Sequence, residues 1–406
     1  MLIGPSQTRV SGPLSAFAVG FADELTRQGY RPGVIGNQMR LLAHLSRWLV
    51  DEGRGADALH TTEVERFLLA RRAAGYTQLL SIKAMQPILA YLRGLGVAPI
   101  PPLPTPSGPV EAALERYRLY LTVERGLGAR TARGYVDAVR LFLRGRTSPD
   151  GLALDLRNLT AADVISFVVG RCPYQGHSAA RLTVAALRSL LGFLHVQGEM
   201  ERPLAFAVPS VACRRLVGLP KGLEPDQVRR LLTSCDSSTQ NGCRDFAILT
   251  MLVRLGLRAS EVTKLAIDDI DWRAGELIVR GKANCTERLP LPGDVGEAVA
   301  AYLRNGRPAT AHGRTVFVRI KAPHGPLSAG GVTQVVAAAA RRAGLGRIHA
   351  HRLRHTAATR MLRAGASLPE IGQLLRHRRA LTTAIYAKVD RDALRTIARP
   401  WPGDVP

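Results

Sequence analysis

Six prolines crowd the twelve residues 98–109, APIPPLPTPSGP, and this segment limits the possible folds of the chain more than any other. Proline has no backbone N–H and holds φ near −65°, so such a run favours an extended, semi-rigid connector. A chain of 406 residues is also longer than one ordinary hydrophobic core supports. We therefore expect a domain boundary at 98–109 and two or three domains in all.

The segments on both sides of this connector, 1–97 and 110–205, have helical patterns. Each contains an apolar stripe with the spacing of an amphipathic helix. The stripe residues are Leu41, Leu42, Leu45, Trp48 and Leu49 in the first segment, and Tyr135, Val136, Val139, Phe142 and Leu143 in the second. Two helical domains are therefore expected here.

The two helical segments also match each other weakly. Gly29 matches Gly126 at an offset of 97, the LHTTEVERFLLARR stretch matches LTAADVISFVVGR at 100, and LAYL matches LGFL at 102. A slow drift of the offset is what short loop insertions produce between copies of a repeat. The sequence therefore suggests an internal repeat, with chance similarity between two helical patterns as the alternative.

A second connector, 206–222, precedes a region in which helices and strands alternate. The basic pair Arg214 and Arg215 in this connector is suited to following a phosphate backbone, with a solvated linker as the alternative. Helices are expected at 225–232, 244–255, from about 258, from Asp294 to about 304, at 328–342, 351–364 and from 367, with strands at 277–280, 288–291 and 316–318. The predicted fold class is mainly α with a small β-sheet, with helical N-terminal domains followed by a mixed α+β domain.

The charge of the chain favours nucleic acid as its partner. Lys and Arg number 56 against 32 Asp and Glu, and all but six of the basic residues are arginine. Because a planar guanidinium matches phosphate oxygens, this excess points to a polyanion. Residues 221–406 hold 30 basic against 16 acidic residues and are expected to bind most tightly. A genomic bias toward arginine is the alternative explanation.

The cysteines and the apolar runs suggest an intracellular protein. Five cysteines without a CxxC pair predict neither a disulfide framework nor a zinc site. No apolar run is expected to reach membrane-spanning length, and the N-terminus lacks the features of a signal peptide. We therefore expect a soluble, cytoplasmic protein without membrane contact.

The stretch His351–Tyr386, HRLRHTAATRMLRAGASLPEIGQLLRHRRALTTAIY, gathers residues suited to phosphodiester chemistry. His351 and Arg354 are three residues apart on one predicted helix and share a face. The guanidinium suits non-bridging oxygens and the imidazole moves a proton near neutral pH, although an ordinary surface pair is the alternative. HRLRH lacks the acidic residue of the HExxH zinc motif, so no metal site is expected.

Four motifs in this order resemble the catalytic domain of the tyrosine recombinase and integrase superfamily, which includes phage and transposon integrases and Xer-type recombinases. They are GLRASE at 256–261, GKANCTERLPLP at 281–292, HRLRH at 351–355 and LLRHRRALTTAIY at 374–386. The resemblance covers about residues 223–399. It implies that 223–406 is the catalytic domain with a C-terminal tail and that 110–205 is similar to the family's core-binding domain.

The resemblance also implies a role for individual residues. By position, Arg258 looks like the first arginine, Lys282 like the hairpin lysine, His351 and Arg354 like the ends of HxxR, His377 like the second histidine, and Tyr386 like the nucleophile. Glu261 is expected to orient Arg258, with an ordinary surface carboxylate as the alternative. Arg376 stands where the family has glycine, which bears on the geometry of that turn.

The implied chemistry needs neither a metal ion nor another cofactor. A tyrosine hydroxyl with an ordinary pKa of about 10 needs a charged pocket, and the arginines stabilise the charge that develops at phosphorus. His351 would handle the tyrosine proton, Lys282 would protonate the leaving 5′-hydroxyl, and His377 would bind a phosphoryl oxygen. The 3′-phosphotyrosine bond conserves energy, so rejoining needs no ATP.

The implied function is a site-specific recombinase or integrase that integrates, excises or transposes a mobile element. Its implied partners are double-stranded DNA recombination sites, further copies of the chain in a tetramer, and accessory recombinases. Candidate DNA contacts are Arg214, Arg215, Arg288 and Arg352, and residues 1–97 would form a second DNA-binding module or a protein-contacting one. The alternatives are Xer-type resolution, type IB topoisomerase activity and a catalytically inactive accessory protein.

Overall fold

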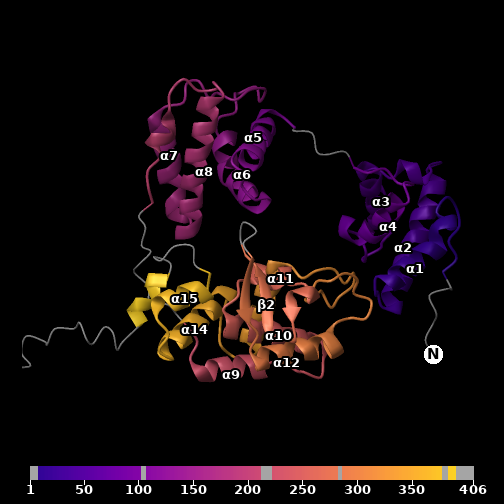
Figure 1. The fold of residues 1–406 in the computed structure, drawn as a ribbon. Helices are drawn as coiled ribbons and strands as arrows, with labels where there is room; N and C mark the ends of the chain where they lie inside the picture. The colour runs from indigo at the N-terminus through magenta and orange to yellow at the C-terminus, as the bar shows by residue number, and fades with distance from the viewer. Residues whose placement is uncertain (1–7, 102–106, 212–221, 282–285, 377–382, 390–406) are drawn as a thin grey trace, which may run out of the picture. The chain divides into compact units, whose positions relative to one another are not determined.

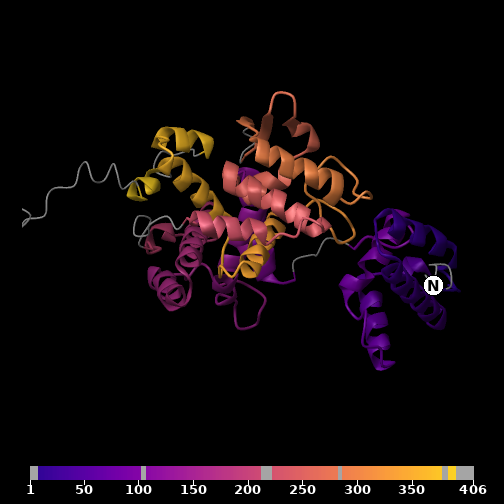
Figure 2. The ribbon, with the colours of Figure 1, turned by 90° about the horizontal axis from the view of Figure 1, so that it is seen from below.

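The computed structural model describes residues 8–101, 107–211, 222–281, 286–376 and 383–389. It is mainly helical with one small sheet, which confirms the predicted fold class (Figures 1 and 2). Three large apolar cores of the described residues lie within residues 14–98, 113–208 and 223–353.

The N-terminal module is a bundle of four helices. These are α1 (Ala18–Arg27), α2 (Pro32–Asp51), α3 (Thr61–Ala73) and α4 (Ile82–Gly94). Pro32 begins α2, where a missing N–H costs no helical hydrogen bond, and the Ser81 hydroxyl caps α4 by accepting from the Ala84 N–H. The buried side chains of Phe21, Leu45 and Ile88 join the helices around one core.

The second module is also a four-helix bundle. It consists of α5 (Pro109–Leu119), α6 (Ala129–Arg144), α7 (Ala161–Arg171) and α8 (His177–Val196). One expectation needs correction here, because α8 is long and apolar enough to cross a membrane. Half of its most apolar window is buried, and Leu187, Leu190 and Leu194 are fully enclosed, so its apolar composition serves the core of this bundle.

The third region carries most of the predicted motifs. Its helices are α9 (Pro225–Thr233), α10 (Gln240–Leu255), α11 (Ala259–Lys264), α12 (Gly293–Ala301), α13 (Ala329–Arg342), α14 (Ala350–Arg363) and α15 (Leu368–Leu374), followed by a 3₁₀ helix at Ala384–Val389. Helix α10 is the central element, because Ala247, Ile248, Met251 and Leu252 are fully buried among the surrounding helices. This packing fixes the position of Leu255, the last residue of α10, and so of the turn that follows it.

The sheet differs from the predicted one. It has three antiparallel strands in the order β1 (Ile270–Asp271), β2 (Glu276–Arg280) and β3 (Thr286–Pro290), with Ile278 opposite Arg288. The two-residue β1 was missed because it is too short for an alternating pattern. The strand predicted at 316–318 is wrong, since this segment forms only an isolated bridge between Val318 and Pro326.

Several predicted helix limits also shift. Helix α10 begins at Gln240, four residues before the predicted start, because the Thr239 side chain caps it by accepting from the Gly242 N–H at 3.0 Å. Asp294 lies inside the first turn of α12, and Pro292 is its N-cap. The helix expected from 367 begins at Leu368 as α15, because Ser367 and Glu370 form a capping box at its start.

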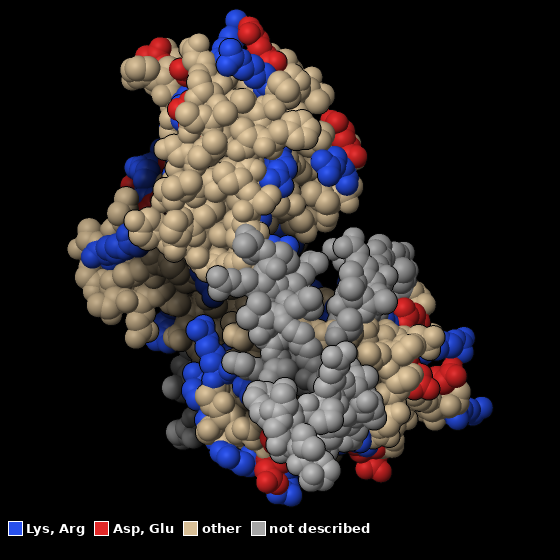
Figure 3. All heavy atoms as spheres, turned by 90° about the vertical axis from the view of Figure 1, so that its left-hand side faces the viewer, with Lys and Arg blue, Asp and Glu red and all other residues tan. Residues whose placement is uncertain are grey.

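Basic side chains do not form one continuous surface on the face that Figure 3 shows. Lys and Arg occur there in separate groups, several of them beside Asp or Glu. Eighteen ion pairs join the described residues, and many are exposed pairs of the Arg118–Glu115 kind, with side chains 45% and 44% accessible. Some of the arginines are therefore neutralised by a carboxylate beside them, and arginines without an acidic neighbour are better suited to binding an anion.

Candidate active site

A tight turn after α10 positions two of the predicted arginines. Gly256 ends the helix in the left-handed conformation, with φ of +58°. A Cβ atom there would lie 2.5 Å from Leu375, so the site needs glycine for space as well as for conformation. The turn places Arg258 at the N-cap of α11, and the Gly256 carbonyl accepts a hydrogen bond from Arg354 Nη1 at 2.6 Å.

Glu261 is buried in this turn and binds two arginines. Its carboxylate accepts hydrogen bonds from the Arg258 backbone N–H at 2.8 Å, from Arg258 Nη1 at 2.5 Å and from Arg376 Nη2 at 2.8 Å. Burial alone would raise the pKa of Glu261, but the charge of Arg376 and the bonds from Arg258 outweigh it and hold the pKa below its usual value. Glu261 is therefore an anion that orients Arg258.

Arg376 adopts the backbone conformation that glycine would favour. Its φ is +55°, a left-handed value that costs a residue with a side chain about 1–2 kcal/mol. The side chain is buried and binds Glu261 and the Leu374 carbonyl, while its own carbonyl accepts from Arg258 Nη2 at 3.1 Å. The turn thus keeps a glycine-like shape, and the ion pair with Glu261 offsets the strain.

Replacing Glu261 by glutamine should strongly destabilise this region. The change leaves the buried Arg376 guanidinium without a counter-charge, which we expect to lower the free energy of unfolding by about 3–5 kcal/mol. Urea unfolding followed by circular dichroism measures the loss, and adding Arg376→Gly should restore part of it. Glu276→Gln is the control, because Glu276 pairs with an exposed arginine and should cost less than about 1 kcal/mol. Equal losses in the two variants would contradict the account.

Arg354 lies deeper than the other described cations. Only 2% of the residue is exposed, and its guanidinium donates to the carbonyl oxygens of Gly256 and Leu375. Burial, followed by repulsion from Arg258, lowers its pKa to about 10, so it remains charged at neutral pH. Two of its five N–H groups make these bonds.

Tyr386 is held by a histidine on α14. Its ring packs with Ala358, Ile371 and Leu375 in a small apolar cluster, and its hydroxyl lies 2.9 Å from His355 Nδ1. Because burial first, then His351 and Arg354, lower the pKa of His355 to about 4, the imidazole is neutral at pH 7. With its proton on Nε2, His355 accepts the hydrogen bond from Tyr386.

His351 lies one turn before His355 on α14. The two rings meet edge to face with centroids 4.5 Å apart. One side of His351 is exposed to solvent, but partial burial and then the charges of Arg354 and Arg258 lower its pKa. Burial also raises the pKa of Tyr386 to about 12, against the opposing effect of Arg354. The tyrosine hydroxyl is therefore protonated in this state.

The structure describes only some of the remaining predicted site residues. Lys282, His377, Arg214 and Arg215 fall outside the described residues. Arg288 is exposed on β3 and pairs with Glu276 at 3.0 Å. Arg352 donates to the Gly222 carbonyl at 3.5 Å. Within the described ranges, no group of three His, Cys, Asp or Glu side chains is placed to hold a metal ion.

Sequence reasoning missed two residues of this site. His355 was considered only as half of a zinc motif, although its spacing of four residues from His351 places both rings on one face of α14. Arg376 was noted only as a replacement for glycine. Its ion pair with Glu261 joins residues 115 positions apart, which a local sequence pattern does not reveal.

The chain is similar to known proteins along nearly its whole length. The sequence profile of the "Phage integrase family" matches residues 221–392, and that of the "Phage integrase, N-terminal SAM-like domain" matches residues 114–198. The integrase/recombinase y4rA of Sinorhizobium fredii is 41% identical over 97% of this chain and 96% of its own length. The tyrosine recombinase XerD of Mycobacterium tuberculosis is 34% identical over 72% of this chain and 97% of its own length.

Solved structures show the same fold. XerH bound to palindromic difH DNA aligns with a TM-score of 0.56 and 18% identity, covering 82% of this chain and 93% of its own. A lambda integrase dimer bound to a core site aligns with a TM-score of 0.53 and 19% identity, covering 72% and 98%. The fold and the site define an enzyme of the DNA strand-transfer class. The chain belongs to the phage integrase family of tyrosine recombinases.

Proposed function

We propose that Tyr386 is the nucleophile with which this recombinase cuts DNA. Its oxygen would form a bond to the scissile phosphorus, giving a 3′-phosphotyrosine, as the bond from phosphorus to the 5′-oxygen breaks. The observation that carries the proposal is the 2.9 Å contact between the Tyr386 hydroxyl and His355, on the helix that also carries Arg354. Attack by a free 5′-hydroxyl on the phosphotyrosine reverses the step and joins two strands.

Tyr386 is protonated at neutral pH, so the reaction needs a group that takes up its proton. Tyr386 has a pKa of about 12 and His355 one of about 4, so proton transfer between them is unfavourable as they stand. A phosphate entering beside His351 and His355 brings negative charge, which raises the pKa of a nearby imidazole. Substrate binding would thus turn the histidine pair into a base for the tyrosine proton.

The arginines would supply the positive charge that the transition state needs. Arg354 is fixed by two carbonyl groups and Arg258 by Glu261, so neither guanidinium has to be ordered when charge develops on the phosphoryl oxygens. The Arg258 side chain is 39% exposed and can meet a ligand directly. By position in the sequence, Lys282 would protonate the departing 5′-oxygen and His377 would bind a phosphoryl oxygen.

The assembly on DNA would contain several copies of the chain. One structural relative is a lambda integrase tetramer bound to a Holliday junction, with a TM-score of 0.54. We propose the same kind of assembly here, on paired sites at the ends of a mobile element. The similarity to y4rA along nearly its whole length supports an integrase role over chromosome resolution, because the XerD relatives lack a counterpart for over a quarter of this chain.

A plasmid carrying two copies of the element's end sequence tests this function. Strand exchange should produce deletion circles or inverted plasmids without ATP or added metal. Relaxed plasmids with unchanged sequence would identify a type IB topoisomerase, and binding without any cut strand would identify an inactive accessory protein. If products form only when a second recombinase is present, the assembly contains an accessory enzyme.

A further inference from the structure

The N-terminal module has helix positions that match those of the second module. Helices α2 and α6 begin 97 residues apart, α3 and α7 begin 100 residues apart, and α4 and α8 end 102 residues apart. Gly29 and Gly126, at the first of these offsets, both have left-handed φ values, of +80° and +60°. The offset between matching residues increases from 97 to 102 from one helix pair to the next, so the additional residues lie between the matched helix segments.

The cores of the two modules are equivalent as well. At the same offsets, buried residues of one module match buried residues of the other, as in Met39 and Val136, Leu42 and Val139, Leu45 and Phe142, Val64 and Val164, Ile88 and Leu190, and Leu92 and Leu194. Phe21 and Tyr91 meet with ring centroids 5.5 Å apart at 44°, and Tyr117 and Phe193 do so at 5.6 Å and 44°. Three helix limits at these offsets and a shared core indicate two copies of one fold, in which α2 is longer than α6 and α8 is longer than α4.

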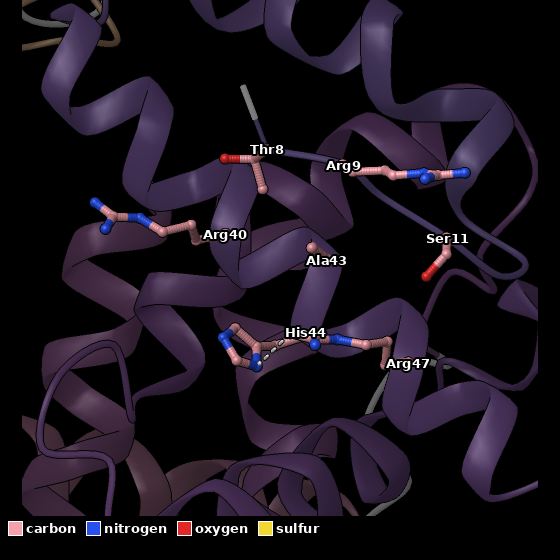
Figure 4. Close-up of a pocket in the computed structure, with 7 residues that line it drawn as sticks. All are labelled: Thr8, Arg9, Ser11, Arg40, Ala43, His44 and Arg47. Atoms are coloured by element: carbon pink, nitrogen blue, oxygen red, sulfur yellow. Dashed lines mark hydrogen bonds between the residues drawn. The ribbon is translucent and has the colours of Figure 1, made fainter. Parts of the chain in front are cut away.

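The surface of α2 carries a basic pocket. Its volume is about 400 Å³, and the segment Thr8–Ser11 borders it on one side. Arg40, His44 and Arg47 line it from successive turns of α2 (Figure 4). Arg47 Nη2 lies 3.3 Å from His44 Nδ1, and the Arg40 guanidinium turns back along the helix and donates to Asn37 Oδ1 at 2.6 Å. Arg9 is the third arginine of a lining that also contains a threonine and a serine and no acidic residue.

The acidic residues of the module do not neutralise this pocket. Its ion pairs join Arg27 to Glu24, Arg54 to Glu63, and Arg66 to Glu52 and Glu63, and none of the described pairs involves Arg9, Arg40 or Arg47. Nearby, the buried Arg71 stacks on Tyr76 at 4.2 Å, and two of its nitrogens are buried without a hydrogen-bond partner. Tyr76 in turn contacts His44, with ring centroids 5.0 Å apart.

From these observations we infer that the α2 pocket binds the phosphate backbone of duplex DNA. Arg40 and Arg47 are seven residues apart, about 10 Å along the helix, so they reach different phosphates of one strand. A neutral His44 can add a hydrogen bond, because burial and then Arg47 and Arg71 lower its pKa. The choice of DNA over another polyanion rests on the proposed function. The N-terminal module is then a second DNA-binding module, which contacts the DNA that flanks the cleavage site.

The test measures binding of the full-length protein to a fluorescent duplex of random sequence over a range of salt concentrations. The Arg40→Gln/Arg47→Gln variant should bind about tenfold or more weakly at 0.1 M salt, and its slope of log K against log salt should be smaller by about 1.8, or 0.9 per lost phosphate contact. The Arg31→Gln/Lys83→Gln variant loses the same charge from exposed positions outside the pocket and should retain nearly the wild-type slope.

Two results would overturn the inference. One is an unchanged salt slope in the pocket variant, and the other is an equal loss in the control variant, which would show that only net charge matters. Covalent cutting of a short nicked duplex is measured in parallel and should persist in the pocket variant. If wild type binds with the expected slope but never cuts, the proposed function fails while the pocket inference stands.

Discussion

Replacing Arg354 by alanine is expected to abolish strand cleavage and to destabilise the catalytic region. The change removes a buried cation and leaves the carbonyl oxygens of Gly256 and Leu375 without their donor. Unsatisfied buried carbonyls cost about 1–3 kcal/mol each, so the free energy of unfolding should fall by about 2–6 kcal/mol. The loss of a fixed charge beside the phosphate should lower the cleavage rate at least about 100-fold.

Two further variants separate these effects. Arg360 is exposed on the same helix, so Arg360→Ala removes an equal charge and should change neither stability nor cleavage by much. Arg354→Lys keeps the charge, but one ammonium cannot hydrogen-bond to both carbonyl groups. Relative to Arg354→Ala, it should restore more of the free energy of unfolding than of the cleavage rate. Cleavage is measured below the unfolding temperature of each variant. An Arg354→Ala enzyme that cuts at the wild-type rate would remove Arg354 from the mechanism.

The fold was predictable where local patterns decide it. Proline and a capping box mark the start of α15, and a glycine that must be left-handed marks the end of α10. The apolar stripes of the two helical modules correspond to buried faces. Strand β1 was missed and a strand at 316–318 was wrongly predicted, because two or three residues carry no periodicity and only pairing with distant partners decides their conformation.

The site was predictable in its motifs but not in its contacts. Motif spacing suggested Arg258, Glu261, His351, Arg354 and Tyr386, and the structure places them around α11, α14 and the 3₁₀ helix that follows α15. The bond between Tyr386 and His355, and the ion pair between Arg376 and Glu261, depend on how these elements pack. Such contacts join residues far apart in sequence, so one chain without its fold does not reveal them.

The second prediction with a large expected effect is that Tyr386→Phe abolishes strand cleavage. Phenylalanine keeps the ring that packs with Ile371 and Leu375 but removes the hydroxyl held by His355. Stability should therefore change little, because the lost hydrogen bond contributes about 1 kcal/mol. The reaction should stop completely, because no other hydroxyl is expected at the attacking position. DNA binding should be unaffected, which separates this variant from a misfolded one.

The most direct measurement uses a nicked duplex taken from the element's own ends, on which cleavage releases a short fragment and traps the protein on DNA. Wild type should form a covalent adduct that survives denaturing electrophoresis, and peptide mapping should locate the DNA on Tyr386. Tyr386→Phe should form none while binding the same duplex. An adduct that persists in Tyr386→Phe, or that maps to another residue, would contradict the assignment of the nucleophile.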